Sequence, residues 1–279
     1  MSRELLRVIG AGTFTIIGLS VAAYFIFGGA PQPEADQFWD VSAEGNTAVI
    51  DHSDWQYLLE EYVISDDPSG VNLVDYQNLL EDDKAVLDRY IDQLSSIDPR
   101  TYNRTEQHAY WINLYNALTV QLIIENYPAE SITKLGASPL SFGPWDDNII
   151  TLAETELSLN DIEHGILRPL WNDYRVHFAV NCASIGCPNL QAMAFTADNS
   201  EALLDQAAGE YLAHPRGARF EDGTLILSSI FDWYGIDFGD DQGQVLETLS
   251  QHAPSAIANE LAEYADDITY EYNWQLNDF

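Results

Sequence analysis

Apolar residues recur at helical spacing along much of the chain. This spacing predicts helices over residues 52–64, 82–97, 160–167, 201–212, 230–238 and 245–264. Between residues 105 and 127 the apolar positions leave almost no polar face, which indicates a helix buried on all sides. Pro128 ends this segment, because a proline cannot continue a helix. The expected core is therefore one central buried helix surrounded by shorter ones.

Shorter apolar runs predict extended segments between these helices. They cover residues 71–76, 149–158, 175–180, 218–227 and 268–276. Residues 175–180 are interpreted as a core strand, and residues 218–227 as a hairpin that turns at Asp222 and Gly223. We find no internal repeat and no change of composition after residue 36. The sequence thus predicts one helix-rich α+β globular domain over residues 51–279, with a small mixed or antiparallel sheet.

The N-terminal residues form a separate hydrophobic block. Residues 8–27 are twenty uncharged, mostly apolar positions behind Arg3 and Arg7, and a helix of that length spans about 30 Å, the thickness of a bilayer core. The length favours a retained transmembrane helix within residues 1–30 over a cleaved signal peptide, and residues 31–50 are expected to be a linker. Because the basic end should stay in the cytoplasm, we expect a single-pass membrane protein whose soluble domain is extracytoplasmic, in the periplasm or at the cell surface.

Charge narrows the range of partners. The chain has 45 acidic and 11 basic residues and a formal net charge of −34. Such a surface repels phosphate backbones, so the composition excludes nucleic-acid binding and disfavours contact with anionic lipid headgroups. Only the predicted transmembrane helix provides contact with a membrane. Abundant acid and scarce lysine also suit a salt-rich surrounding, in which counterions screen the self-repulsion.

The central helix carries amides that need partners. Tyr110, Asn113 and Ala117 share one helical face, and Asn116 follows Asn113 by three positions. An unpaired buried amide costs about 1–3 kcal/mol. We therefore expect this helix to present its amides to another part of the fold.

Several motifs resemble those of a known family, the domain of unknown function 547. The similarity covers about residues 70–275 and is carried by YWINLYNA (110–117), DIEHGILR (161–168), VHFAVNCASIGCP (176–188), SIFDWY (229–234) and YNW (272–274). In this family Asn113, Glu163, His164, Arg168 and Cys182 occupy characteristic motif positions. The resemblance implies a domain identity but brings no agreed reaction with it.

Cys182 is the candidate nucleophile. It follows the expected strand in a turn of small residues, and a nucleophilic thiolate needs a base together with a group that orients the base. His164 is the candidate base, because its short helix precedes this strand closely enough to pack beside it. Glu163 or Asn113 would orient the imidazole ring. The set predicts a cysteine-dependent hydrolase or acyltransferase that needs no cofactor and acts on an unknown small-molecule or peptide substrate.

Three further residues are candidates for substrate binding. Arg168 suits a substrate carboxylate, although pairing with an acid inside the fold is the alternative. Asn181 adjoins the cysteine, and His177 lies five residues before it. In a continuous strand this odd separation would place His177 and Cys182 on opposite faces, which argues against His177 as the base.

Two other arrangements stay open at the cysteines. In an exported chain, Cys182 and Cys187 can form a disulfide, and the protein would then be a non-catalytic envelope module for structure or binding. His164 and His177 could instead join both cysteines around zinc, but the spacings are not those of familiar zinc sites, so no metal is expected.

Overall fold

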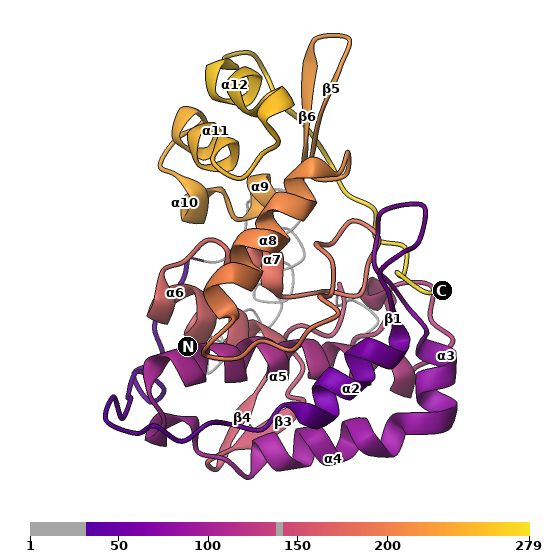
Figure 1. Ribbon diagram of the computed structural model, residues 1–279, viewed down its shortest axis with the longest axis vertical. Coiled ribbons are helices and arrows are strands. Elements are labelled where there is room, and N and C mark those ends of the chain that lie inside the picture. Colours follow the sequence, from indigo (N-terminus) through magenta and orange to yellow (C-terminus); the bar gives the residue numbers. More distant parts are fainter. Residues whose placement is uncertain (1–31, 138–141) are drawn as a thin grey trace, which may run out of the picture.

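One long helix lies across the middle of the molecule. In the computed structural model, which describes residues 32–137 and 142–279, this helix is α5, Arg104–Glu125, and the side chain of Asn103 accepts a hydrogen bond from the amide of Glu106 at its start. Figure 1 shows α2 and α4 on one side of α5 and α7 and α8 on the other. Residues of every helical face of α5 are buried, which confirms the prediction of a central helix.

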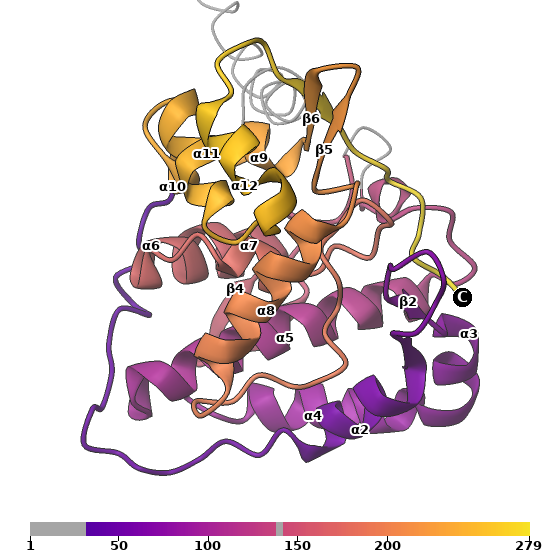
Figure 2. The same ribbon diagram turned by 45° about the horizontal axis from the view of Figure 1, so that its top comes forward.

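Short helices make up most of the remaining structure. In chain order these are α2 Ser53–Tyr62, α3 Tyr76–Asn78, the π-helical turn η1 Leu79–Asp83, α4 Lys84–Ser95, the 3₁₀ turns η2 Pro99–Thr101 and η3 Ile132–Lys134, the π-helix η4 Asp161–Leu167, α6 Arg168–Trp171, α7 Val176–Ala179, α8 Ser200–Ala213, α9 Ile230–Trp233, α10 Gly235–Phe238, α11 Gln242–Ser250 and α12 Ser255–Glu263. Figure 2 shows α8 between α5 and the paired helices α11 and α12.

The strands form small sheets rather than one large one. Within the described residues, β1 Val63–Ile64 pairs with β2 Leu73–Val74, and β3 Ile150–Leu152 pairs with β4 Thr155–Leu157, both antiparallel. In the third sheet, β6 Thr224–Ser228 lies between antiparallel β5 Ala218–Glu221 and parallel β7 Thr269–Glu271. The chain is therefore a helix-rich α+β fold with small sheets, as expected.

Several local predictions differ from the structure. Residues 175–180 are not a core strand, because Val176–Ala179 form the short helix α7, buried on all sides. An uninterrupted apolar run of this length does not distinguish a buried strand from a buried helical turn. The helix expected over residues 245–264 is divided into α11 and α12 just before Pro254, and in the strand expected over residues 268–276 only Thr269–Glu271 join a sheet.

The segment expected to be a linker packs on the domain. Trp39 is 1% exposed and meets the Trp111 ring edge-on at 5.1 Å, while the amides of Asp36 and Ala43 donate to the carbonyls of Gly165 and Tyr102. Residues 36–50 therefore belong to the packed fold. The predicted transmembrane helix within residues 1–30 lies outside the described residues, and none of the described helices is both long and apolar enough to cross a membrane.

The amides of α5 find their partners in two loops. Asn113 donates to the carbonyl of Phe195 (2.7 Å) and accepts from the amide of the same residue (3.0 Å). Asn116 donates to the carbonyl of Ala179 (2.9 Å) and accepts from the amide of Asn181 (2.8 Å). The expectation that the central helix presents amides to the fold is confirmed.

We predict that Asn116→Ala lowers the free energy of unfolding by about 3 kcal/mol, because it leaves the buried carbonyl of Ala179 and the amide of Asn181 without a partner. Urea unfolding followed by circular dichroism measures this loss. The matched control is Asn148→Ala, since Asn148 is exposed and bonds only an exposed carboxylate, and its effect should stay within about 0.5 kcal/mol. Equal losses in the two variants would contradict the assignment.

Candidate functional site

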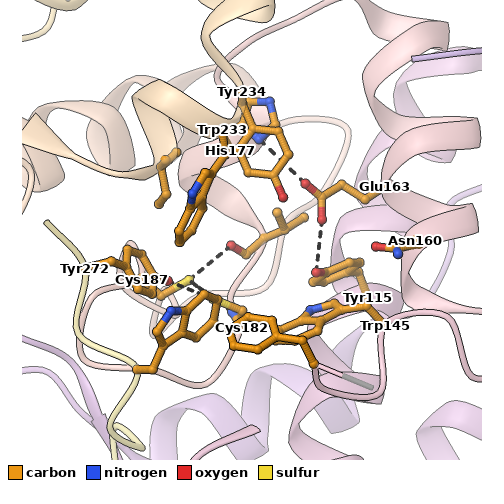
Figure 3. Close-up of a pocket in the computed structure, with 14 residues that line it drawn as sticks. Tyr115, Trp145, Asn160, Glu163, His177, Cys182, Cys187, Trp233, Tyr234 and Tyr272 are labelled. Atoms are coloured by element: carbon orange, nitrogen blue, oxygen red, sulfur yellow. Dashed lines mark hydrogen bonds and ion pairs between the residues drawn. The ribbon is translucent and has the colours of Figure 1, made fainter. Parts of the chain in front are cut away.

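A small pocket lies where two hydrophobic clusters meet. The larger cluster surrounds α5, and the smaller one joins α8 to β5, β6 and the helices α9–α12. Trp145, Cys182 and Trp274 belong to the first cluster or pack against it, whereas Trp233 and Tyr272 pack against the second. All of them line the pocket, whose volume is about 50 Å³ (Figure 3).

The loop after α7 brings Cys182 to this pocket. Asn181 positions the loop from inside, because its side chain accepts from the amide of Ala183 and donates to the carbonyl of Pro188. Farther along, the amides of Ile185 and Gly186 donate to the carbonyls of Gln275 and Asn273 in the C-terminal segment. Gly186 is required there, since a Cβ would lie 2.7 Å from the backbone nitrogen of Asn273. Asn181, expected to bind substrate, is therefore buried and occupied by the loop itself.

Three groups that can form hydrogen bonds surround the sulfur of Cys182. Its Sγ lies 2.9 Å from Sγ of Cys187, 3.0 Å from the hydroxyl of Tyr272 and 3.6 Å from the hydroxyl of Ser184. The hydrogen bond between the two thiols, together with those that link Sγ to Tyr272 and Ser184, lowers the pKa of Cys182, although burial acts in the opposite direction. Burial raises the pKa of Cys187 well above its usual value. Both cysteines are free, so the structure presents a thiolate-stabilising arrangement at Cys182.

Glu163 and His177 face the cysteines across the pocket (Figure 3). One carboxylate oxygen of Glu163 accepts from the hydroxyl of Tyr115 at 3.1 Å, and the other lies 3.7 Å from Nδ1 of His177. A carboxylate and an imidazole are thus placed opposite a thiol. This is the arrangement in which proton transfer can accompany nucleophilic attack.

Asp237 fixes the imidazole of His177 from behind. Its Oδ2 lies 2.6 Å from Nε2 of His177 and 2.6 Å from Nε of Arg168, while Oδ1 accepts from Nη2 of Arg168 at 3.0 Å. Although burial opposes ionisation, the hydrogen bonds from His177 and Arg168 lower the pKa of Asp237 to about 2. Because the carboxylate binds the proton at Nε2, Nδ1 is the nitrogen that faces Glu163 and the pocket.

The predicted base occupies a different position. His164 follows Glu163 on η4 but does not line the pocket, and its Nδ1 accepts from Nη1 of Arg168 at 3.2 Å. Burial lowers the pKa of His164, so the ring is neutral and its basic nitrogen is already occupied. Asn113 likewise lies away from the pocket, bound to the backbone of Phe195. Arg168 is ion-paired with Asp237 inside the fold and is not a pocket-lining residue.

The strand that would have placed His177 and Cys182 on opposite faces does not form. In α7 its side chain lines the same pocket as Cys182. Sequence reasoning also missed Asp237 and Tyr272. Asp237 lies three residues after the SIFDWY motif, and Tyr272 opens the YNW motif, so proximity to these motifs was the available signal.

The histidines and cysteines considered as zinc ligands do not all come together in the structure. His164 is directed to Arg168, while His177 and the two cysteines line the pocket. Within residues 32–137 and 142–279 no group of three or more His, Cys, Asp or Glu side chains is arranged to hold a metal ion.

We predict that Asp237→Asn lowers the free energy of unfolding at pH 7 by about 3 kcal/mol, because it removes the carboxylate charge that pairs with the buried guanidinium of Arg168. The pKa of Asp237 is lower in the folded state (about 2) than its ordinary value of 3.8. The carboxylate therefore contributes fully above about pH 4, and its contribution is lost as the pH falls towards 2. Urea unfolding of both proteins at pH 7, 5 and 2.5 should show the difference shrinking only at the lowest pH.

The matched control for this series is Asp232→Asn, since Asp232 is exposed on the neighbouring helix α9. We expect it to change the free energy of unfolding by less than about 0.5 kcal/mol. A difference between wild type and Asp237→Asn that stayed constant from pH 7 to pH 2.5 would disprove the role of the carboxylate.

Comparison with known proteins identifies one family. The model of the family described as "Protein of unknown function, DUF547" matches residues 99–212, which include the motifs at 110–117, 161–168 and 176–188. The motifs after residue 212 lie outside the matched region. No curated protein and no solved structure matches the chain. Residues 99–212 therefore belong to the DUF547 family, which confirms the resemblance drawn from the motifs.

Proposed function

We propose that this protein is a cysteine-dependent hydrolase or acyltransferase with Cys182 as its nucleophile. One observation carries the proposal: Sγ of Cys182 lies within hydrogen-bond distance of three groups that can act as donors, in a pocket that Glu163 and His177 also line (Figure 3). The donors favour the thiolate, and the facing pair provides acid–base groups. The substrate is a small molecule or the end of a peptide, because the pocket admits only a small group.

The reaction can be written with the residues in place. The thiolate attacks a carbonyl carbon, the C–S bond forms, and the carbonyl electrons move to oxygen. Nδ1 of His177 takes the proton of the Cys182 thiol as the thiolate forms and gives it to the leaving group as the C–X bond breaks. It then accepts a proton from the water or acceptor alcohol that releases the product. Asp237 holds the ring in the required tautomer throughout.

A side chain stabilises the negatively charged oxygen, the oxyanion, that forms when the thiolate attacks the carbonyl carbon. The amide of Cys182 donates to Sγ of Cys187, and the amide of Ala183 donates to Oδ1 of Asn181, so the two amides nearest the nucleophile are occupied. The hydroxyl of Tyr272, 3.0 Å from the nucleophilic sulfur, is the neighbouring donor.

A second candidate is a non-catalytic envelope module. It is favoured by the short distance between the two sulfurs, 2.9 Å, since a modest movement would join them in a disulfide. In that case the Glu163–His177–Asp237 network would serve only to order the fold.

We also propose that residues 1–30 anchor the protein in a membrane, with the acidic domain on the extracytoplasmic side. The support is the uncharged length of residues 8–27 and the basic residues before it.

The reactivity of Cys182 tests the catalytic proposal. In the reduced, native chain at pH 6.5, Cys182 should be alkylated by iodoacetamide faster than in the urea-unfolded chain, because more of it is thiolate. Tyr272→Phe removes one donor and should slow alkylation about tenfold. The control, Tyr270→Phe, changes an exposed tyrosine two residues earlier and should leave the rate unchanged. Mass spectrometry of tryptic peptides locates the label, and slower reaction of the native chain would rule out the nucleophile.

Membrane fractionation tests the anchor. The full chain should sediment with membranes and resist extraction by alkaline carbonate, whereas a chain without residues 1–30 should be released. A protease added outside the cytoplasmic membrane should digest the domain of the full chain. Recovery of a mature chain that begins near residue 31 and is free of membranes would show a cleaved signal peptide instead.

A further inference from the structure

We propose that Cys182 and Cys187 form a redox couple that reduces small disulfides, with Cys182 as the attacking thiol and Cys187 as the resolving thiol. This inference rests on the proposed function in one respect, since both need a reactive thiolate at Cys182. It goes beyond acyl transfer because it assigns a chemical task to Cys187, which that reaction uses only as a hydrogen-bond donor.

The two sulfurs are positioned differently with respect to the pocket. Cys182 is partly exposed, whereas Cys187 is 3% exposed and lies behind it, 2.9 Å from sulfur to sulfur. A disulfide entering the pocket therefore reaches Cys182 first. Cys187 lines the same pocket but is almost fully buried, and it lies within reach of the sulfur that the substrate modifies.

The electrostatics support the same division of roles. Hydrogen bonds to Cys182 lower its pKa, whereas burial raises that of Cys187. Thiolate attack needs an ionised thiol first and a second thiol that ionises later. The amide of Cys182 donates to Sγ of Cys187 at 3.0 Å, so the negative charge that develops on Cys187 has a donor in place.

The reaction balances without any other oxidant. The thiolate of Cys182 attacks one sulfur of R–S–S–R, an S–S bond forms to Cys182, and R–S⁻ leaves with the electron pair of the broken bond. Cys187 then gives up its proton to that thiolate and attacks Sγ of Cys182. The Cys182–Cys187 bond forms, and the second R–S⁻ leaves. Two electrons have moved from the protein to the disulfide, which ends as two thiols.

The loop between the cysteines is prepared for this closure. Its backbone is held by the hydrogen bonds of Ile185 and Gly186 to the C-terminal segment, and Asn181 fixes its start. Because these bonds already order the loop in the reduced protein, little conformational entropy remains to be lost when the ring closes. The substrate must be small, because the pocket is narrow. It must also lack a large acidic group, because the carboxylate of Glu163 faces the pocket.

The experiment uses the full chain in a mild detergent and bis(2-hydroxyethyl) disulfide as a small uncharged probe. The reduced wild type should fall from two free thiols to none, lose the mass of two hydrogens and carry no adduct. Cys187→Ala should instead accumulate one mercaptoethanol adduct on Cys182, because nothing resolves it. Cys182→Ala should not react, since its remaining thiol is buried. Dithiothreitol should restore both thiols of the wild type.

Two controls separate this proposal from the previous one. Cys187→Ser, which keeps a hydrogen-bond donor, should behave like Cys187→Ala towards the probe, and circular dichroism reports whether either variant folds. Two outcomes would overturn the redox couple but not the nucleophilic role of Cys182. One is a stable adduct on the wild type, and the other is a wild type that does not react with the probe although iodoacetamide still alkylates its Cys182. A native Cys182 that resists both reagents would overturn both proposals.

Discussion

The paired hydrogen bonds of Asn116 fix the geometry on which the site depends. One amide on the central helix binds the last residue of α7 and the residue directly before Cys182. His177 lies inside α7, and Cys182 lies one residue beyond the bound amide of Asn181. A single buried side chain therefore sets the positions of the imidazole and the thiol relative to α5. Since both partners are backbone groups, the constraint does not depend on which side chains line the pocket.

The spacing of apolar residues predicted the elements that are buried on one face and the elements that extend over many residues. Helices such as α2, α4 and α8, the buried α5 and the hairpin of β5 and β6 all carry a spacing that extends over enough residues to be recognised. The short helix α7 does not, because Val176–Ala179 are buried on all sides and four residues complete only about one turn. The packing of Trp39 was missed for a related reason: one aromatic residue in an irregular segment leaves no pattern, although it enters the core.

Of the predicted site residues, the sequence placed Cys182 and Glu163 in the pocket correctly but not His164. Cys182 and Glu163 line the pocket as residues of the motifs that suggested them. His164, the next residue of the π-helix η4, does not line the pocket. Arg168, four residues further on the same face, then binds the histidine. Asp237 comes from α10, 60 residues after His177, and no spacing in the sequence connects two residues at that separation.

The acidic composition of the chain limits which groups can stabilise the proposed thiolate of Cys182. With 11 basic residues against 45 acidic ones, cations are scarce, and the buried Arg168 is already paired with Asp237. The neighbours of Cys182 are instead neutral hydrogen-bonding groups, the thiol of Cys187 and the hydroxyls of Tyr272 and Ser184. Such hydrogen bonds act over about 3 Å and are not screened as the field of a distant cation would be. Hydrogen bonds of this kind would stabilise the proposed thiolate of Cys182 to the same extent at low and at high ionic strength.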